Sequence, residues 1–118
     1  MDIAELVQAA ERSEEVRVVV RDGEERRTPI WIVAVGPSVF VRSYRAGQGK
    51  WYQHVKASGS FPLEIAGEDV VVTCEPVTDA PTLEDVSAAY RAKYADAPEM
   101  PDMVTPEVVA TTLRLSPS

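Results

Sequence analysis

Residues 16–43 read VRVVVRDGEERRTPIWIVAVGPSVFVRS, and this stretch decides the fold. Every second residue from Val16 to Val20 is apolar and faces the same way, which is the period of a half-exposed strand. Asp22-Gly23 is typical of a turn, and residues 28–35 are apolar on both faces, which predicts a fully buried strand. After a break at Gly36, residues 39–43 are predicted to form a third strand.

The segments on either side of this stretch add helices and further strands. Asp2 is an N-cap candidate followed by apolar residues at helical spacing, which predicts a short helix that ends near Arg12. The other predicted elements are helices over residues 50–57 and 81–94 and strands over residues 61–65, 70–77 and 111–115.

Together these elements predict a single domain of residues 1–118 with an α+β fold. About six short strands are expected, and the close spacing of the early ones favours antiparallel pairing, because parallel pairs need crossovers of about a dozen residues or more. Strands this short need closure or cover to protect their edges. We therefore predict a small six-stranded antiparallel barrel with flanking helices.

The composition excludes several classes of protein. Of 118 residues, 45% are hydrophobic and 26% are charged, a balance that excludes a disordered chain. No apolar run approaches the roughly 20 residues of a membrane span, and the acidic N-terminal segment is unlike a signal peptide, so a cytoplasmic protein is expected. One Cys and one His exclude a disulfide framework and an ordinary structural zinc site, so no metal is expected.

The net charge of −7 is distributed unevenly along the chain. Residues 17–56 contain eight Lys or Arg and three Asp or Glu, a balance of +5, whereas residues 1–16 and 57–118 carry −4 and −8. Six of the eight basic residues are Arg, whose planar guanidinium group favours bidentate hydrogen bonding to phosphate or carboxylate. The basic segment therefore favours a compact anionic ligand, while the overall charge argues against a membrane or nucleic-acid partner.

Other motifs in the sequence give weaker indications of function. Gly47-Gln48-Gly49-Lys50 resembles the end of a P-loop, but Tyr44 and Trp51 stand where that motif needs Gly and Ser or Thr. His54 is expected to be a surface or packing residue, and Cys74 a small buried hydrophobe. The basic residues and nearby aromatics could also form a groove that stacks single-stranded nucleic acid, which stays a third hypothesis.

Three segments carry a family resemblance: Arg26–Trp31, Val41–Arg45 and Gly49–Tyr52. With the tail from Ala89 to Leu115, they resemble an uncharacterised bacterial family of small proteins, a domain of unknown function, over nearly the whole chain. More distantly, the order Arg-x-Thr-Pro, then Ser and a Gly loop, then Trp-Tyr is similar to deazaflavin-dependent reductases. Those enzymes belong to the FMN-binding split-barrel superfamily, which is pyridoxamine-phosphate-oxidase-like.

The distant resemblance implies a split β-barrel that forms a homodimer and holds FMN or a deazaflavin in a groove near the dimer interface. It implies that the cofactor phosphate lies near Arg26-Arg27-Thr28 and that Ser43 lies near the reactive ring. The full set of implied cofactor-binding residues is Arg26, Arg27, Thr28, Arg42, Ser43, Lys50, Trp51 and Tyr52.

Two readings of function follow from this resemblance. The first is a reductase that uses a flavin or deazaflavin cofactor. The second is a non-catalytic dimeric scaffold or small-ligand-binding protein that has lost the cofactor site. The second reading rests on the acids of Asp22-Gly23-Glu24-Glu25, which stand where the related enzymes have a Gly-rich basic turn, and on His54, which replaces an Asn. Acids beside a phosphate oppose its binding.

Overall fold

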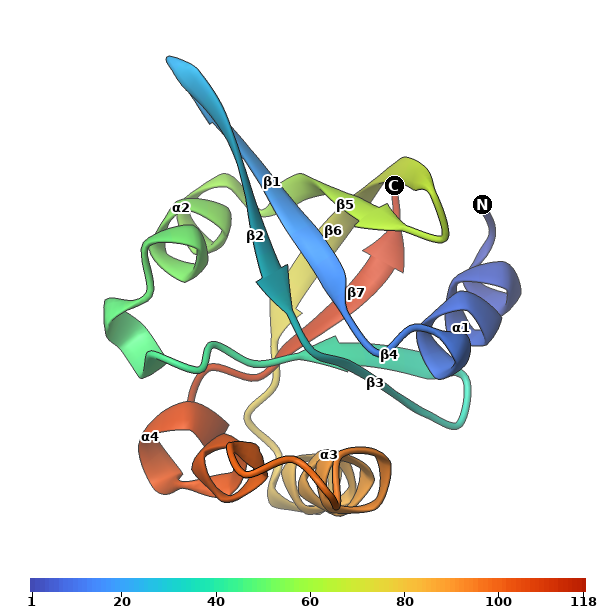
Figure 1. The fold of residues 1–118 in the computed structure, drawn as a ribbon, viewed down its shortest axis with the longest axis vertical. Helices are drawn as coiled ribbons and strands as arrows, with labels where there is room; N and C mark the ends of the chain where they lie inside the picture. Colours follow the sequence, from blue (N-terminus) through green and yellow to red (C-terminus); the bar gives the residue numbers. More distant parts are fainter.

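Seven antiparallel strands form one curled sheet in the computed structural model, which describes residues 1–118 (Figure 1). The order across the sheet is β2-β1-β5-β6-β7-β4-β3, so β2 and β3 are its two edges. The strands are β1 (Val16–Asp22), β2 (Glu24–Ile30), β3 (Ile32–Val35), β4 (Ser38–Val41), β5 (Ser60–Ile65), β6 (Glu68–Pro76) and β7 (Leu113–Pro117).

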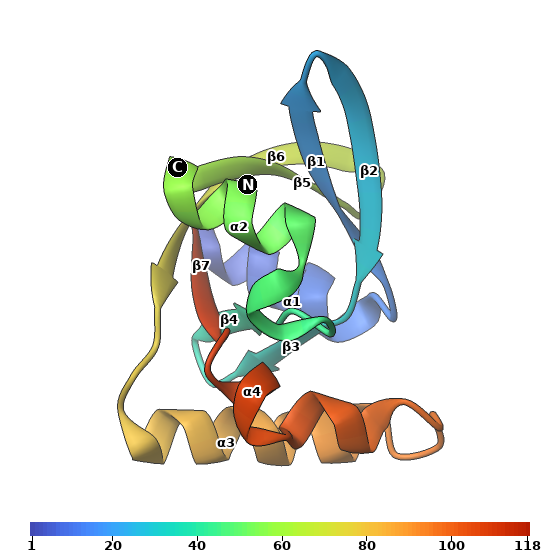
Figure 2. The same ribbon diagram turned by 90° about the vertical axis from the view of Figure 1, so that its left-hand side faces the viewer.

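Helices cover the sheet from several sides. Figure 2 shows α3 running across one end of the molecule, beneath β3 and β4. The helices are α1 (Ile3–Arg12), α2 (Lys50–Ser58), α3 (Ala80–Lys93) and α4 (Pro106–Val109), with 3-10 turns η1 (Ala46–Gln48) and η2 (Met100–Val104). α1 starts where predicted: the Asp2 side chain accepts a hydrogen bond from the Glu5 backbone N–H, and the Glu5 side chain accepts one from the Asp2 backbone N–H. No helix has the length and apolar character needed to cross a membrane.

Two hydrophobic clusters lie on the two faces of the β3–β4 hairpin. The first fills the inside of the curled sheet together with side chains of α1 and α2, and it contains Ile32. The second lies between the hairpin and α3, η2 and α4, and it contains Val33. Since neighbouring residues of β3 enter different clusters, the apolar character of both faces of this strand has a direct structural cause.

The predicted strand over residues 28–35 is in fact two strands, and this is why the sheet has seven strands rather than six. β2 pairs with β1 up to Ile30, opposite Val16, and β3 pairs with β4 from Ile32, opposite Val41. Between them, Trp31 marks the point where the chain leaves one edge of the sheet for the other. The prediction that the whole stretch is buried was also wrong, because Pro29 is exposed and Thr28 and Trp31 are only half-buried.

Lys93, at the end of α3, ties three parts of the fold together. Its Nζ donates hydrogen bonds to the backbone carbonyls of Ala10 (2.8 Å), Ser13 (2.6 Å) and Ile32 (2.6 Å). The Ala10 and Ser13 carbonyls lie at the C-terminal end of α1, where helical N–H donors run out, and the Ala10 carbonyl accepts one long bond from the Ser13 N–H (3.4 Å). This single ammonium group therefore fixes α3 to both α1 and β3.

Candidate functional site

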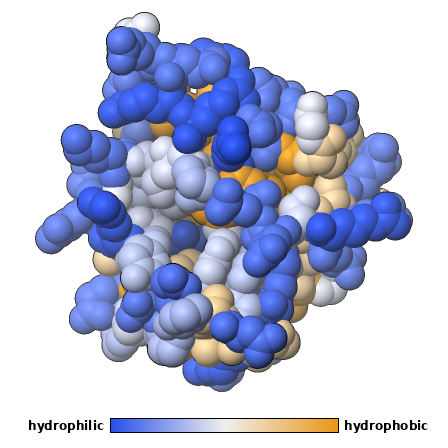
Figure 3. Space-filling view, viewed as in Figure 1, coloured by the Kyte–Doolittle hydropathy of each residue, from blue (hydrophilic) through white to orange (hydrophobic).

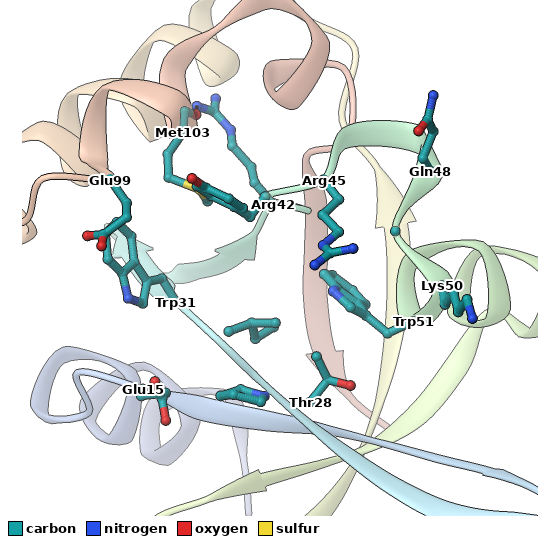
Figure 4. Close-up of a pocket in the computed structure, with 14 residues that line it drawn as sticks. Glu15, Thr28, Trp31, Arg42, Arg45, Gln48, Lys50, Trp51, Glu99 and Met103 are labelled. Carbon is teal, nitrogen blue, oxygen red and sulfur yellow. Dashed lines mark hydrogen bonds between the residues drawn. The ribbon is translucent and has the colours of Figure 1, made fainter.

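A groove with a volume of about 680 Å³ lies where the β2–β3 corner faces η1, α2 and η2 (Figure 4). This volume is within the range of about 300–1,000 Å³ that is typical of small-molecule sites. The lining residues are Glu15, Thr28, Pro29, Ile30, Trp31, Arg42, Tyr44, Arg45, Gln48, Gly49, Lys50, Trp51, Glu99 and Met103.

One side of the groove is cationic. Arg45 and Lys50 are exposed and line the groove, and neither forms an ion pair with any carboxylate of the chain. α2 begins at Lys50, directly after Gly49, and no side chain caps this end of the helix. A helix N-terminus carries free N–H groups and partial positive charge, so it adds to the attraction of the two cations for an anion.

Trp51 supplies an apolar surface beside these cations. It is the second residue of α2 and is 9% exposed, with the exposed part in the groove. Figure 4 shows Arg45 extending toward the Trp51 ring from one side and Thr28 lying on the other. Apolar surface next to converging cations suits a ligand that combines a flat ring with an anionic group.

Arg42 also lines the groove, but its charged head is held elsewhere. The residue is 1% exposed, and Figure 4 shows its side chain running toward Met103. The guanidinium donates to Thr112 Oγ1 (2.8 Å), Ser87 Oγ (2.9 Å) and the carbonyls of Met103 (3.0 Å) and Leu83 (3.0 Å). Burial lowers the pKa of the Arg42 guanidinium, and this group forms no ion pair with a carboxylate of the chain. Arg42 therefore fixes the η2 side of the groove against β4 and α3.

Arg26 and Arg27, the expected phosphate-binding pair, lie outside the groove. Arg26 pairs with Asp22 at 3.0 Å across the β1–β2 hairpin. Arg27 pairs with Glu25 (3.0 Å), Glu64 (2.6 Å) and Asp69 (2.9 Å). The Arg27 hydrogen bond is the main cause of the lowered pKa of Asp69. Both guanidinium groups are thus already occupied by carboxylates of the same chain.

Ser43 and Tyr52 lie beneath the lining rather than in it. The Ser43 hydroxyl is buried and has no hydrogen-bond partner. A Cβ on Gly49 would lie 2.5 Å from Ser43 Oγ, so only glycine fits at the start of α2 without displacing the serine. Tyr52 is buried on the other side of α2, with Lys56 5.7 Å from its ring centroid.

The structure therefore brings Thr28, Arg42, Lys50 and Trp51 to the groove, out of the eight residues expected. The expected set lacked five polar lining residues: Glu15, Tyr44, Arg45, Gln48 and Glu99. Arg45 had a usable signal, since it is a cation in the Gly-punctuated loop before the Trp-Tyr pair. Glu15 and Glu99 had no such signal in the sequence, because only the tertiary fold brings these two residues to the same groove. No group of His, Cys, Asp and Glu side chains forms a metal site.

The overall fold of the chain is similar to those of two solved bacterial proteins. A Listeria innocua protein described as "Putative Pyridoxamine 5'-phosphate oxidase" superposes with a TM-score of 0.61 at 8% identity, covering 98% of this chain and 91% of that one. The conserved hypothetical protein Rv2991 of Mycobacterium tuberculosis gives a TM-score of 0.62 at 13% identity, covering 98% and 78%.

At the level of sequence, residues 5–115 match the family described as "Uncharacterized protein conserved in bacteria (DUF2255)". The chain belongs to this family, which confirms the resemblance to an uncharacterised bacterial family of small proteins. No curated protein matches the chain.

Proposed function

We propose that the groove binds a flavin or deazaflavin cofactor and that the protein acts as a reductase. The observation that carries the proposal is the pair of unpaired cations, Arg45 and Lys50, on either side of the uncapped start of α2. An anionic group such as the phosphate of FMN would be held there by both side chains and by backbone N–H groups.

The residues of the groove fit such a cofactor. Trp51 offers an apolar surface for a flat ring, and Gly49, the residue before the first turn of α2, also lines the groove. A bound flavin or deazaflavin would supply electron and hydride transfer, which no side chain of the chain can supply. The protein's own contribution is to bind the anionic group, orient the ring and exclude water from one of its faces.

Removal of the two cations provides the test. We expect the double variant Arg45→Ala/Lys50→Ala to bind FMN at least about 10-fold more weakly than the native chain, because each charge-assisted contact contributes about 1.5–3 kcal/mol. Binding is measured by the thermal shift with FMN or a deazaflavin and by a titration that follows flavin fluorescence.

Arg17→Ala/Arg26→Ala is the matched control, since it removes two exposed cations outside the groove. Its affinity for FMN should stay within about twofold of the native value, because separated surface charges act weakly through salt solution. Riboflavin, which lacks the phosphate, should bind the native chain and the double variant equally. Failure of the native chain to bind either cofactor at concentrations well above micromolar would contradict the proposal.

The proposal includes a homodimer. β2 is an edge strand with an unpaired outer side, and it leads directly into the groove at Thr28 and Trp31. A second copy placed on this edge would cover the open side of the groove and exclude water from it. Light scattering should give twice the mass of the chain, and a monomer at micromolar concentration would remove this part of the proposal.

The alternative, a scaffold or small-ligand-binding protein without a cofactor, is favoured by one observation. Arg27 is neutralised by three carboxylates, and two of them, Glu64 and Asp69, come from β5 and β6. The positive charge expected to hold the phosphate therefore stabilises the sheet instead. Under this alternative neither cofactor raises the melting temperature.

A further inference from the structure

The side of the groove opposite the cations carries negative charge that nothing in the chain neutralises. Glu15, between α1 and β1, and Glu99, just before η2, both line the groove and are exposed. Neither carboxylate forms an ion pair, even though Arg45 and Lys50 line the same groove. Opposite charges that stay apart within one cavity remain available to a ligand.

An indole ring in a fixed orientation lies beside these acids. Trp31 lines the groove and stacks on Tyr94, with ring centroids 4.0 Å apart and an interplanar angle of 3°. Tyr94 is itself held, since its hydroxyl lies 2.6 Å from the Glu14 carbonyl and accepts a hydrogen bond from the Ile32 backbone N–H (3.2 Å). Figure 4 shows Glu99 next to Trp31, with Glu15 on the same side of the groove.

We propose that Glu15, Trp31 and Glu99, here called the acidic wall, bind a flat organic cation of the N-alkylpyridinium type as the substrate of the groove. The indole ring attracts a cation through its π-electrons, and the negative charges of the two carboxylates attract the cation as well. A neutral ring would gain nothing from the unpaired carboxylates, and an anion would be repelled by them.

The groove then has two ends of opposite charge. The cationic end at Arg45 and Lys50 holds the anionic cofactor, and the acidic wall holds a positively charged partner in the same cavity. This inference rests on the proposed function for the identity of the neighbouring ligand. The recognition of the cation depends only on the acidic wall, so the two can be tested separately.

The test uses the chain without cofactor and two probes of nearly equal shape. 1-Methylquinolinium carries a fixed positive charge, and quinoline is neutral at pH 8. Binding is followed by the NMR signals of the indole N–H groups; the chain has two Trp residues, so Trp31→Phe assigns them. We expect the cation to shift the Trp31 signal and to bind at least about fivefold more tightly than quinoline.

Paired variants identify the carboxylates that act. Glu15→Gln/Glu99→Gln should weaken binding of the cation about 10-fold and leave that of quinoline unchanged. The control Glu11→Gln/Glu14→Gln removes two exposed charges outside the groove lining and should change the affinity by less than about twofold. Equal affinity for the two probes, or an equal loss in the control, would overturn the inference.

The same titrations separate this inference from the proposed function. If Arg45→Ala/Lys50→Ala binds 1-methylquinolinium as the native chain does, and the native chain does not bind FMN, the proposed function is contradicted and the cation-binding role of the acidic wall is supported. If FMN binds and the cation does not shift Trp31, the acidic wall fails alone.

Discussion

Replacement of Arg42 by Met is expected to lower the free energy of unfolding by about 2–4 kcal/mol. The guanidinium is the donor for two hydroxyl groups and two carbonyls that lie between β4, α3 and η2. Met fills a similar volume but donates nothing, so buried acceptors lose their partner, and each such loss costs about 1–3 kcal/mol before relaxation. Urea denaturation followed by circular dichroism measures the change.

Two further variants test whether the loss of stability comes from the hydrogen bonds of the Arg42 guanidinium. Arg42→Lys keeps the charge, but its single ammonium cannot reach four acceptors in a planar arrangement, so an intermediate loss is expected. Arg91→Met is the control, because Arg91 is exposed and has only one ion pair, at 3.5 Å to Glu84. Its effect should stay within about 0.5 kcal/mol. Native stability in Arg42→Met would show that the four hydrogen bonds contribute nothing net.

Lys93→Met is expected to cost about 2–3 kcal/mol. Three backbone carbonyls lose the ammonium group that donates to them, and the hydrogen bonds that join α3 to the end of α1 are lost. Lys56→Met, on the exposed side of α2, is the matched control, and a change of less than about 1 kcal/mol is expected there, because its ammonium contacts only the Tyr52 ring. Equal effects of the two substitutions, measured by urea denaturation, would contradict the role assigned to Lys93.

The difference in free energy of unfolding between the native chain and Lys93→Met is expected to change with pH in a defined direction. Burial lowers the pKa of Lys93 to about 8, whereas Lys in an unfolded chain titrates near 10.4. Between these values the unfolded state binds more protons, so the stability contributed by Lys93 rises with pH from about 8 to 10. The native chain should therefore gain stability relative to Lys93→Met over that window. A flat or falling difference would contradict the lowered pKa.

The sequence predicted the sheet better than the site. Alternation and turn residues located the β1–β2 hairpin, the start of α1 and most of the later strands, because these features are local. The break at Trp31 was missed, since apolar residues continue through it and only long-range pairing separates β2 from β3.

The sequence indicated part of the lining of the candidate groove where its residues are close in sequence. Lys50 and Trp51 open a helix after a Gly-containing loop, and both line the groove, while their role in binding stays a prediction. Arg27 has no local feature that reveals its partners, because Glu64 and Asp69 lie about 40 residues further along the chain and meet it only through strand pairing. Charge counted along the chain could not show which cations stay unpaired.

The position of β7 determines when the sheet can be completed during synthesis on the ribosome. β7 lies between β6 and β4, and it is the only strand that joins the β3–β4 hairpin to the rest of the sheet. The hairpin is made of residues 32–41, but its partner strand spans Leu113–Pro117 and is synthesised after the other six strands of the sheet. Until β7 emerges, the exposed edge of β4 has no native partner, so the native sheet can be completed only after residues 113–117 have left the exit tunnel.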